Sequence, residues 1–229
     1  MAVGVVKSSP PAVVPMNNLM RILQIRPVLG SLLLAGILGL SLPAYADPVS
    51  ELKTWLRDTR TLKADFNQSS TGGAAFGGKS QGTMAISRPG KFRWSITKPY
   101  TQLMVGDGSH IWLYDPELKQ VIMRKSDKAL GGSPAALLAG DNDVDQRFVL
   151  KVDAERDGVA WVIAEPKQND TGFTRIRIGL AGNDLKGMIL ADSFGQVTPL
   201  VFGNVVRNAD TPASLFRFSP PSGVDVLKQ

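Results

Sequence analysis

Cysteine is absent from the 229 residues, and histidine occurs once, as His110. Without cysteine the chain forms no disulfides, so its stability has to come from packing. The same absence excludes thiol catalysis, cysteine metal sites and the acylated cysteine that anchors a bacterial lipoprotein. A single histidine without cysteine provides too few of the usual ligands for a zinc site. The sequence therefore offers no metal site and no cofactor site.

Charged residues are also scarce, at 20% of the chain against 43% hydrophobic residues. This composition excludes a disordered or fibrous chain. The formal net charge is +6, but the first 46 residues contain Lys7, Arg21 and Arg26 and no acid. The rest of the chain carries 23 basic and 20 acidic residues, a net charge of +3. That weak balance, without clusters of Lys and Arg, gives no reason to expect nucleic acid as a partner.

Residues 1–46 have the pattern of a secretory signal peptide. Arg21 and Arg26 precede an apolar run over 28–42, and Pro43-Ala44-Tyr45-Ala46 supplies an Ala-x-Ala cleavage site. The alternative is a membrane anchor, but the run is shorter than the roughly 20 residues that a spanning helix needs. We therefore expect 1–46 to be cleaved and 47–229 to form a single domain in the periplasm of a Gram-negative source.

Hydrophobic periodicity predicts one helix followed by many short strands. Asp47-Pro48 is typical of a helix start, and Val49, Leu52 and Leu56 recur at helical spacing, which predicts a helix over 48 to about 60. Asp107-Gly108 and Asp157-Gly158 predict tight hairpins. Alternating or apolar runs predict strands at 83–87, 92–97, 102–105, 110–114, 148–152, 159–163, 174–180, 185–191, 197–206 and 215–218.

A second helix is predicted between the two groups of strands. Ser133 is a suitable N-cap, Pro134 a suitable first residue and Gly140 a suitable stop, so the helix has about two turns. A helix this short is marginal alone and has to dock Leu137 and Leu138 on the open face of a sheet. The whole pattern predicts one antiparallel sheet, strongly curved or rolled into a barrel.

Three motifs resemble functional sites only in part. Residues 73–80 match the phosphate-binding loop, but Ser80 leads into a strand pattern, so we interpret them as a hairpin loop, with a nucleotide site as the alternative. No Gly-x-Ser-x-Gly elbow accompanies His110, so we interpret it as a strand-end residue and expect no catalytic residue. Asp141, Asp143 and Asp145 lack the Gly and Glu of a calcium loop, which favours a solvated acidic turn.

Arg88 is the residue that stands out. It has the same strand parity as Met84 and Ile86, so it points toward the apolar side of the sheet if the strand continues that far. Two interpretations remain open. The side chain extends to solvent from the strand end, or it donates to unpaired carbonyls at the C-terminal ends of helices that cover the sheet.

Aromatic and methionine side chains on the inward parity raise a second question. For each of them ordinary core packing is the default interpretation. With a rolled sheet and only short helices to cover it, they also fit the lining of a cavity for acyl chains. The residues that we predict to line such a cavity are Met84, Ile86, Phe92, Trp94, Met104, Trp112 and Leu137.

Motifs distributed in order over 47–229 carry a family resemblance; they lie at 63–68, 82–86, 88–94, 99–100, 107–115, 132–138 and 216–224. Together they resemble the outer-membrane lipoprotein carrier protein family, LolA. The resemblance implies an unclosed antiparallel β-barrel, covered by a helical lid that encloses a hydrophobic cavity. It also implies a monomeric periplasmic chaperone without enzymatic activity, which takes acylated lipoproteins from an inner-membrane ABC transporter to an outer-membrane receptor lipoprotein.

The resemblance further implies a lid latch. The arginine of the Arg-Pro motif is Arg88 here, and its implied acceptors are carbonyls of Leu56, Leu138 and Ala139. Two alternatives of function stay open: a related periplasmic lipoprotein sensor or free-lipid transporter, and a periplasmic enzyme that acts on a lipid or glycan through His110.

Overall fold

The computed structural model describes residues 47–70, 78–126, 133–141, 143–168 and 172–229. The predicted signal peptide lies outside these residues, as does most of the glycine-rich loop that resembles a phosphate-binding loop. Within them, no helix has the length and apolar character required to cross a membrane.

The first helix, α1, covers Pro48–Asp58, as its periodicity predicts. The Asp47 carboxylate accepts hydrogen bonds from the amides of Val49 and Ser50, so it caps the helix start. The helix ends at Thr59, which is extended and whose hydroxyl donates to the carbonyl of Trp55 at 2.6 Å. Leu52, Trp55 and Leu56 form the buried face of the helix, which packs near β7 and β8.

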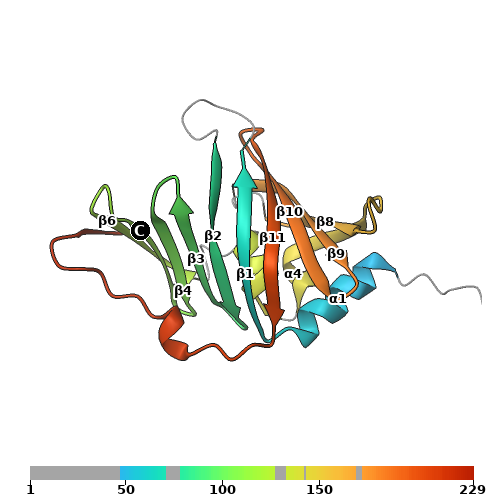
Figure 1. The fold of residues 1–229 in the computed structure, drawn as a ribbon, viewed down its shortest axis with the longest axis horizontal. Helices are drawn as coiled ribbons and strands as arrows, with labels where there is room; N and C mark the ends of the chain where they lie inside the picture. The colour runs from blue at the N-terminus through green and yellow to red at the C-terminus, as the bar shows by residue number, and fades with distance from the viewer. Residues whose placement is uncertain (1–46, 71–77, 127–132, 142, 169–171) are drawn as a thin grey trace, which may run out of the picture. The chain divides into compact units, whose positions relative to one another are not determined.

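Among the described residues, twelve strands form one sheet (Figure 1). The first group comprises β1 Thr61–Ser69, β2 Lys79–Ser87, β3 Lys91–Lys98, β4 Gln102–Asp107, β5 His110–Asp115 and β6 Gln120–Lys125. The second group comprises β7 Phe148–Val152, β8 Ala160–Pro166, β9 Phe173–Ala181, β10 Asp184–Asp192, β11 Val197–Arg207 and β12 Asp225–Lys228.

The sheet does not close on itself. Its order is β12-β6-β5-β4-β3-β2-β1-β11-β10-β9-β8-β7, so β12 and β7 lie at its two ends. Neighbouring strands pair antiparallel except β12 and β6, which pair parallel. The prediction of a mainly β fold with an unclosed antiparallel sheet is confirmed, with this one parallel pair as an exception.

Both predicted hairpins occur at their Asp-Gly pairs. Asp157 and Gly158 have φ of 54° and 72° between β7 and β8, the left-handed conformation that the favoured two-residue hairpin turns require. Gly108 has φ of 98° between β4 and β5. Here the Asp107 carboxylate accepts from the amides of Ser109 and His110, which holds the turn closed.

The segment after β11 differs from the prediction of a strand at 215–218. Ala213–Phe216 forms a 3₁₀ helix, η1, which packs against β3 and β4. Phe216 is buried, and the ring of Phe218 lies 5.7 Å from that of Trp112 and 5.6 Å from that of Tyr114. The alternating aromatic residues are therefore anchors on the outer face of the sheet, and pairing resumes only at β12.

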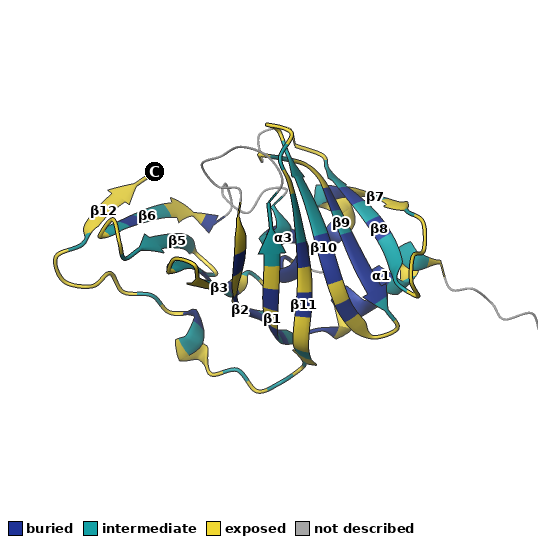
Figure 2. Ribbon diagram, turned by 45° about the horizontal axis from the view of Figure 1, so that its top comes forward, coloured by how far each residue is buried: buried dark blue, intermediate teal, exposed yellow. Residues whose placement is uncertain are grey.

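The short helices lie on the opposite, inner face. α3 covers Pro134–Ala139 and packs on β2 and β3, and α4 covers Val144–Arg147 beside β7. Figure 2 shows α1 and α3 behind the strands. Asp141, Asp143 and Asp145 are exposed, as predicted for an acidic turn, but residues 144–147 add one helical turn. Ser80 lies in β2, so the phosphate-loop interpretation lacks its helix.

Gly82 marks the closest packing within the sheet. A Cβ atom at this position would overlap the backbone carbonyl of Ser95 and lie 2.8 Å from Cζ of Phe66. Phe66 in turn stacks on Trp94 with ring centroids 4.2 Å apart. The absent side chain therefore allows β2 and β3 to pair beneath this aromatic stack.

We expect Gly82→Ala to lower the free energy of unfolding by about 1 to 3 kcal/mol, because a rigid backbone atom occupies the space that Cβ needs. Urea unfolding followed by circular dichroism measures the change. Gly203→Ala is the matched control, since a Cβ at this position of β11 meets nothing within 4 Å. Equal unfolding free energies for the two variants would contradict this account of the packing.

Candidate functional site: an apolar cavity under a short helix

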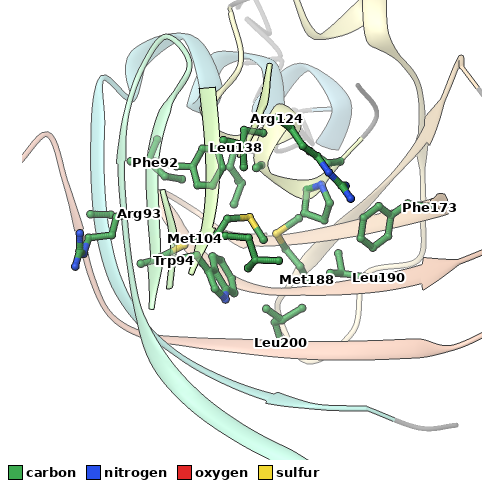
Figure 3. A pocket seen from close by; sticks show the side chains of 18 of the residues that line it. Phe92, Arg93, Trp94, Met104, Arg124, Leu138, Phe173, Met188, Leu190 and Leu200 are labelled. Carbon is green, nitrogen blue, oxygen red and sulfur yellow. The ribbon is translucent and has the colours of Figure 1, made fainter. Parts of the chain in front are cut away.

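A cavity of about 350 Å³ lies between the inner face of the sheet and α3 (Figure 3). Most of its lining is apolar. From the first half of the sheet come Met84, Ala85, Ile86, Phe92, Arg93, Trp94, Met104, Ile111, Leu113, Ile122 and Arg124. Ser133, Pro134, Ala135 and Leu138 come from α3 and its cap, and Phe173, Met188, Leu190 and Leu200 from β9, β10 and β11.

Strand register explains this lining. Met84, Trp94, Met104, Leu113 and Ile122 are paired successively from β2 to β6, so they form one row across five strands. Side chains of directly paired residues project to the same face of a sheet. A single continuous apolar row therefore forms one wall of the cavity.

A second row runs beside the first. Ile86, Phe92, Gly106, Ile111 and Arg124 are paired successively from β2 to β6. A Cβ atom at Gly106 would overlap the ring of Phe92, so the glycine leaves the space that this ring fills. The row is apolar until its last member, which is a cation.

Five of the seven residues predicted to line the cavity do so: Met84, Ile86, Phe92, Trp94 and Met104. The expectation for Trp112 is corrected. Its register partners are Val105 and Met123, so it faces the outer side, where its Nε1 donates to Asp107 Oδ2 at 2.8 Å. Leu137 is 1% exposed and belongs to the packed core beside the cavity. Its neighbour Leu138 lines the cavity in its place.

The prediction for Trp112 was wrong because β5 is apolar on both faces. Ile111 and Leu113 turn inward, while Trp112 and Tyr114 turn outward and are covered by Phe218. An alternating pattern identifies the inner face only where the outer face is polar.

Partial burial tends to raise the pKa of Asp107, but the hydrogen bonds that its carboxylate accepts from Trp112, His110 and Ser109 outweigh this effect and lower the pKa.

The helix that lines the cavity, α3, is held at both ends. At its start, Ser133 Oγ accepts from the amide of Ala136 at 3.1 Å, as its sequence predicts. At its end, the amide of Gly140 donates to the carbonyl of Ala136. Ala136, Leu137, Leu138 and Ala139 are all buried, so packing compensates for the low stability of so short a helix.

Arg88 follows β2 directly and reaches the C-terminal end of α3. Its Nη1 donates to the carbonyl of Leu138 at 3.0 Å, and its Nη2 donates to the carbonyl of Asp141 at 2.6 Å. Carbonyls in the last turn of a helix lack partners within the helix and carry a partial negative charge, so they suit a cation.

The backbone beside Arg88 joins the same helix end. The amide of Gly90 donates to the carbonyl of Ala139 at 2.5 Å, and the amide of Arg88 donates to the carbonyl of Arg60 at 2.8 Å. The carbonyl of Ala139, predicted as an acceptor of the guanidinium, accepts from the amide of Gly90, and its bond to Arg88 stays a prediction. Leu56 lies in the buried core that also contains Leu138. The role of its carbonyl as an acceptor for Arg88 stays a prediction.

Burial lowers the pKa of Arg88, and the nearby carboxylate of Asp141 partly offsets this effect. The ordinary pKa of a guanidinium lies far above neutral pH, so the side chain of Arg88 remains charged at pH 7. The side chain is thus a permanent cation that bonds to helix carbonyls.

His110 begins β5 beside Trp112, with 5.9 Å between ring centroids. It is paired with Lys125 and, by its parity with Trp112, projects to the outer face. It does not belong to the cavity lining. In the described part of the chain, His, Asp and Glu side chains form no group of three that could hold a metal ion.

Several residues that line the cavity were not predicted from the sequence. Ile122 and Arg124 lie on β6, which was not predicted, and Phe173, Met188, Leu190 and Leu200 come from the distant strands β9, β10 and β11. Alternation in Val121-Ile122-Met123-Arg124 offers a weak strand signal. Nothing local indicates that the later strands return to the same cavity, because that depends on the order of strands in the sheet.

The sequence of the chain matches a known family. Residues 57–219 match the family model described as outer membrane lipoprotein carrier protein LolA. The chain is 52% identical over 190 residues to the outer-membrane lipoprotein carrier protein of Dechloromonas aromatica, covering 82% of this chain and 91% of that protein. The corresponding protein of Chromobacterium violaceum is 45% identical over 189 residues, with 82% and 91% covered.

Among solved structures, a LolA superfamily protein from Nitrosomonas europaea superposes with a TM-score of 0.47 at 11% identity, covering 75% of this chain and 97% of that one. The family assignment rests on the sequence matches, which span most of residues 47–229. The chain belongs to the outer membrane lipoprotein carrier protein family, LolA.

Proposed function

We propose that this protein is a periplasmic carrier of acylated lipoproteins and that it holds their acyl chains in the cavity beneath α3. The observation that carries the proposal is the row of paired apolar side chains from Met84 to Ile122, which forms a wall of unfilled apolar space. The family to which the chain belongs is named for the carriage of lipoproteins, not for a catalysed reaction.

The energetics of acyl chains explain why such a carrier is needed. Burial of one CH₂ group is worth about 0.8 kcal/mol, so a chain of about fifteen methylenes gains roughly 12 kcal/mol on leaving water. A lipoprotein therefore does not cross an aqueous compartment with bare chains. The carrier has to offer apolar surface that approaches the membrane in affinity and still permits release.

We expect purified protein to bind a synthetic triacylated lipopeptide, and Leu113→Trp to weaken this binding about tenfold, a loss of about 1.4 kcal/mol. Leu113 is half-buried in the wall of the cavity, so a larger ring there occupies ligand space. Titration calorimetry measures both affinities. Leu118→Trp is the matched control, because Leu118 is 71% exposed in the β5–β6 turn. Equal affinities for the two variants would count against the cavity as the binding site.

The cargo itself separates this proposal from a free-lipid transporter. Protein isolated from periplasm should carry acylated polypeptide, because a lipoprotein carrier is loaded with protein-linked chains. Native mass spectrometry of the gently purified protein identifies the bound species by mass. The same preparation after detergent washing is the control. Free phospholipid or fatty acid as the sole bound species would favour the transporter instead.

The bonds between Arg88 and α3 support a latch in the carrier cycle. Opening the helix to admit acyl chains would break the bonds from Arg88 to Leu138 and Asp141, each worth about 1.5 to 3 kcal/mol for a charged donor. Reclosing would restore them and help to expel the chains. In this cycle an inner-membrane ABC transporter loads the carrier and an outer-membrane receptor lipoprotein unloads it, and the carrier moves between them as a monomer.

We expect Arg88→Leu to load lipoprotein normally and to transfer it poorly, since closure no longer competes with the ligand. Transfer of labelled lipoprotein from the purified, loaded carrier to receptor-containing vesicles measures the rate. Arg93→Leu is the matched control, because Arg93 lies on the neighbouring strand and bonds on the outer face to the carbonyl of Leu215 at 3.4 Å. Normal transfer by Arg88→Leu would refute the latch.

A further inference from the structure

Arg124 is a cation at an inward position of the sheet. It is paired with Ile111, which is paired with Gly106, and that row continues through Phe92 to Ile86. These positions project toward the cavity, and the other side chains in the row are apolar. A solvated charge on a strand normally takes the outward parity, as Lys125 does when it pairs with His110. Register alone therefore directs the charge of Arg124 to the cavity face.

The side chain of Arg124 lies at the edge of the cavity. Figure 3 shows the guanidinium extending toward Phe173, across the lining from Trp94. The other charged lining residue, Arg93, points away from the cavity in the same view and bonds to Leu215. Arg124 is exposed while lining the cavity, so its charge is hydrated at the mouth and not sealed inside.

One contact fixes the position of the guanidinium. Its Nε donates to Oε1 of Gln229 at 2.8 Å, next to the pairing of β6 with β12. Among the described residues, no acidic side chain lines the cavity and no ion pair involves Arg124. Bonding at Nε leaves the two Nη groups of the planar fork to donate to a ligand.

Chains buried in this cavity end at its mouth in oxygen atoms. In an acylated lipoprotein these are the ester and amide carbonyl oxygens at the head of the chains, and a carbonyl oxygen accepts hydrogen bonds and cannot donate them. A guanidinium has donors only, in a rigid planar arrangement. The chemistry at the end of the chains and the chemistry of Arg124 are therefore complementary.

We propose that Arg124 recognises the acyl carbonyls at the head of the bound lipoprotein and thereby distinguishes acylated protein from plain hydrocarbon. This inference rests on the proposed carrier function. It assigns to Arg124 the positioning of the cargo head at the mouth, separate from the bonds of Arg88 to α3. Apolar affinity then comes from the lining rows, and selectivity for the head comes from this cation.

The test compares wild-type protein with Arg124→Gln, Arg124→Lys and the control Lys125→Gln, which removes an adjacent charge from the outer face of the same strand. Three probes are titrated: a synthetic triacylated lipopeptide, diphenylhexatriene, which is apolar and has no oxygen, and lysophosphatidylglycerol, whose head is an anionic phosphate. Circular dichroism establishes that the variants are folded.

We expect Arg124→Gln to bind the lipopeptide about tenfold more weakly, as the loss of one charged hydrogen bond would cause, with diphenylhexatriene binding unchanged. Arg124→Lys keeps the charge without the fork, so its loss should be intermediate, and Lys125→Gln should bind as wild type. Wild-type affinity of Arg124→Gln for the lipopeptide would overturn the inference.

Two further results would also overturn it. An equal loss of lipopeptide and diphenylhexatriene would mean damage to the cavity, and a loss confined to lysophosphatidylglycerol would mean recognition of phosphate. If wild-type protein binds diphenylhexatriene but no lipopeptide, the carrier function itself fails and this inference falls with it. If wild-type protein binds the lipopeptide and Arg124→Gln binds it with the same affinity, the inference about Arg124 fails but the carrier function stands.

Discussion

The end of α3 joins the turn between β2 and β3, and the organisation of the site depends on this junction. Three carbonyls at or just after that end, of Leu138, Ala139 and Asp141, accept hydrogen bonds from Arg88 and Gly90. A helix of six residues gains little from its own hydrogen bonds. Because these carbonyls are satisfied by the sheet, the helix can lie over an apolar surface that it does not fill. The junction therefore allows a helix to line a cavity without a fully packed interface.

The cavity itself is a consequence of strand pairing. Each strand from β2 to β6 contributes one apolar residue to the row that begins at Met84. Protein interiors normally leave few voids larger than a water molecule, so an apolar space of about 350 Å³ is unfilled core. Such space costs stability in the empty protein and gives an apolar ligand its gain in free energy. The unfilled apolar space therefore both lowers the stability of the fold and allows it to bind an apolar ligand.

Two arginines near the cavity differ in burial and in their hydrogen-bond partners. Arg88 is half-buried and its Nη groups donate to carbonyls at or just after the end of α3, whereas Arg124 is exposed and oriented by Gln229. The contrast follows from desolvation, since a buried guanidinium needs acceptors from the protein while one at a mouth can keep water until a ligand replaces it. In the cycle that we propose, the first cation governs the helix and the second meets the cargo.

The sequence alone was sufficient for features that depend on neighbouring residues. Caps and turns identified α1, α3 and both Asp-Gly hairpins, because these signals act within a few residues. Alternation placed Met84, Trp94 and Met104 on the inner face. The tertiary structure decided which face of β5 is inner, since the C-terminal segment covers Trp112 on the outside, and it decided that Arg88 bonds to Leu138 and that Arg124 lies at a cavity. These outcomes follow from contacts between residues far apart in the chain, and periodicity within one strand carries no information about what will later cover it.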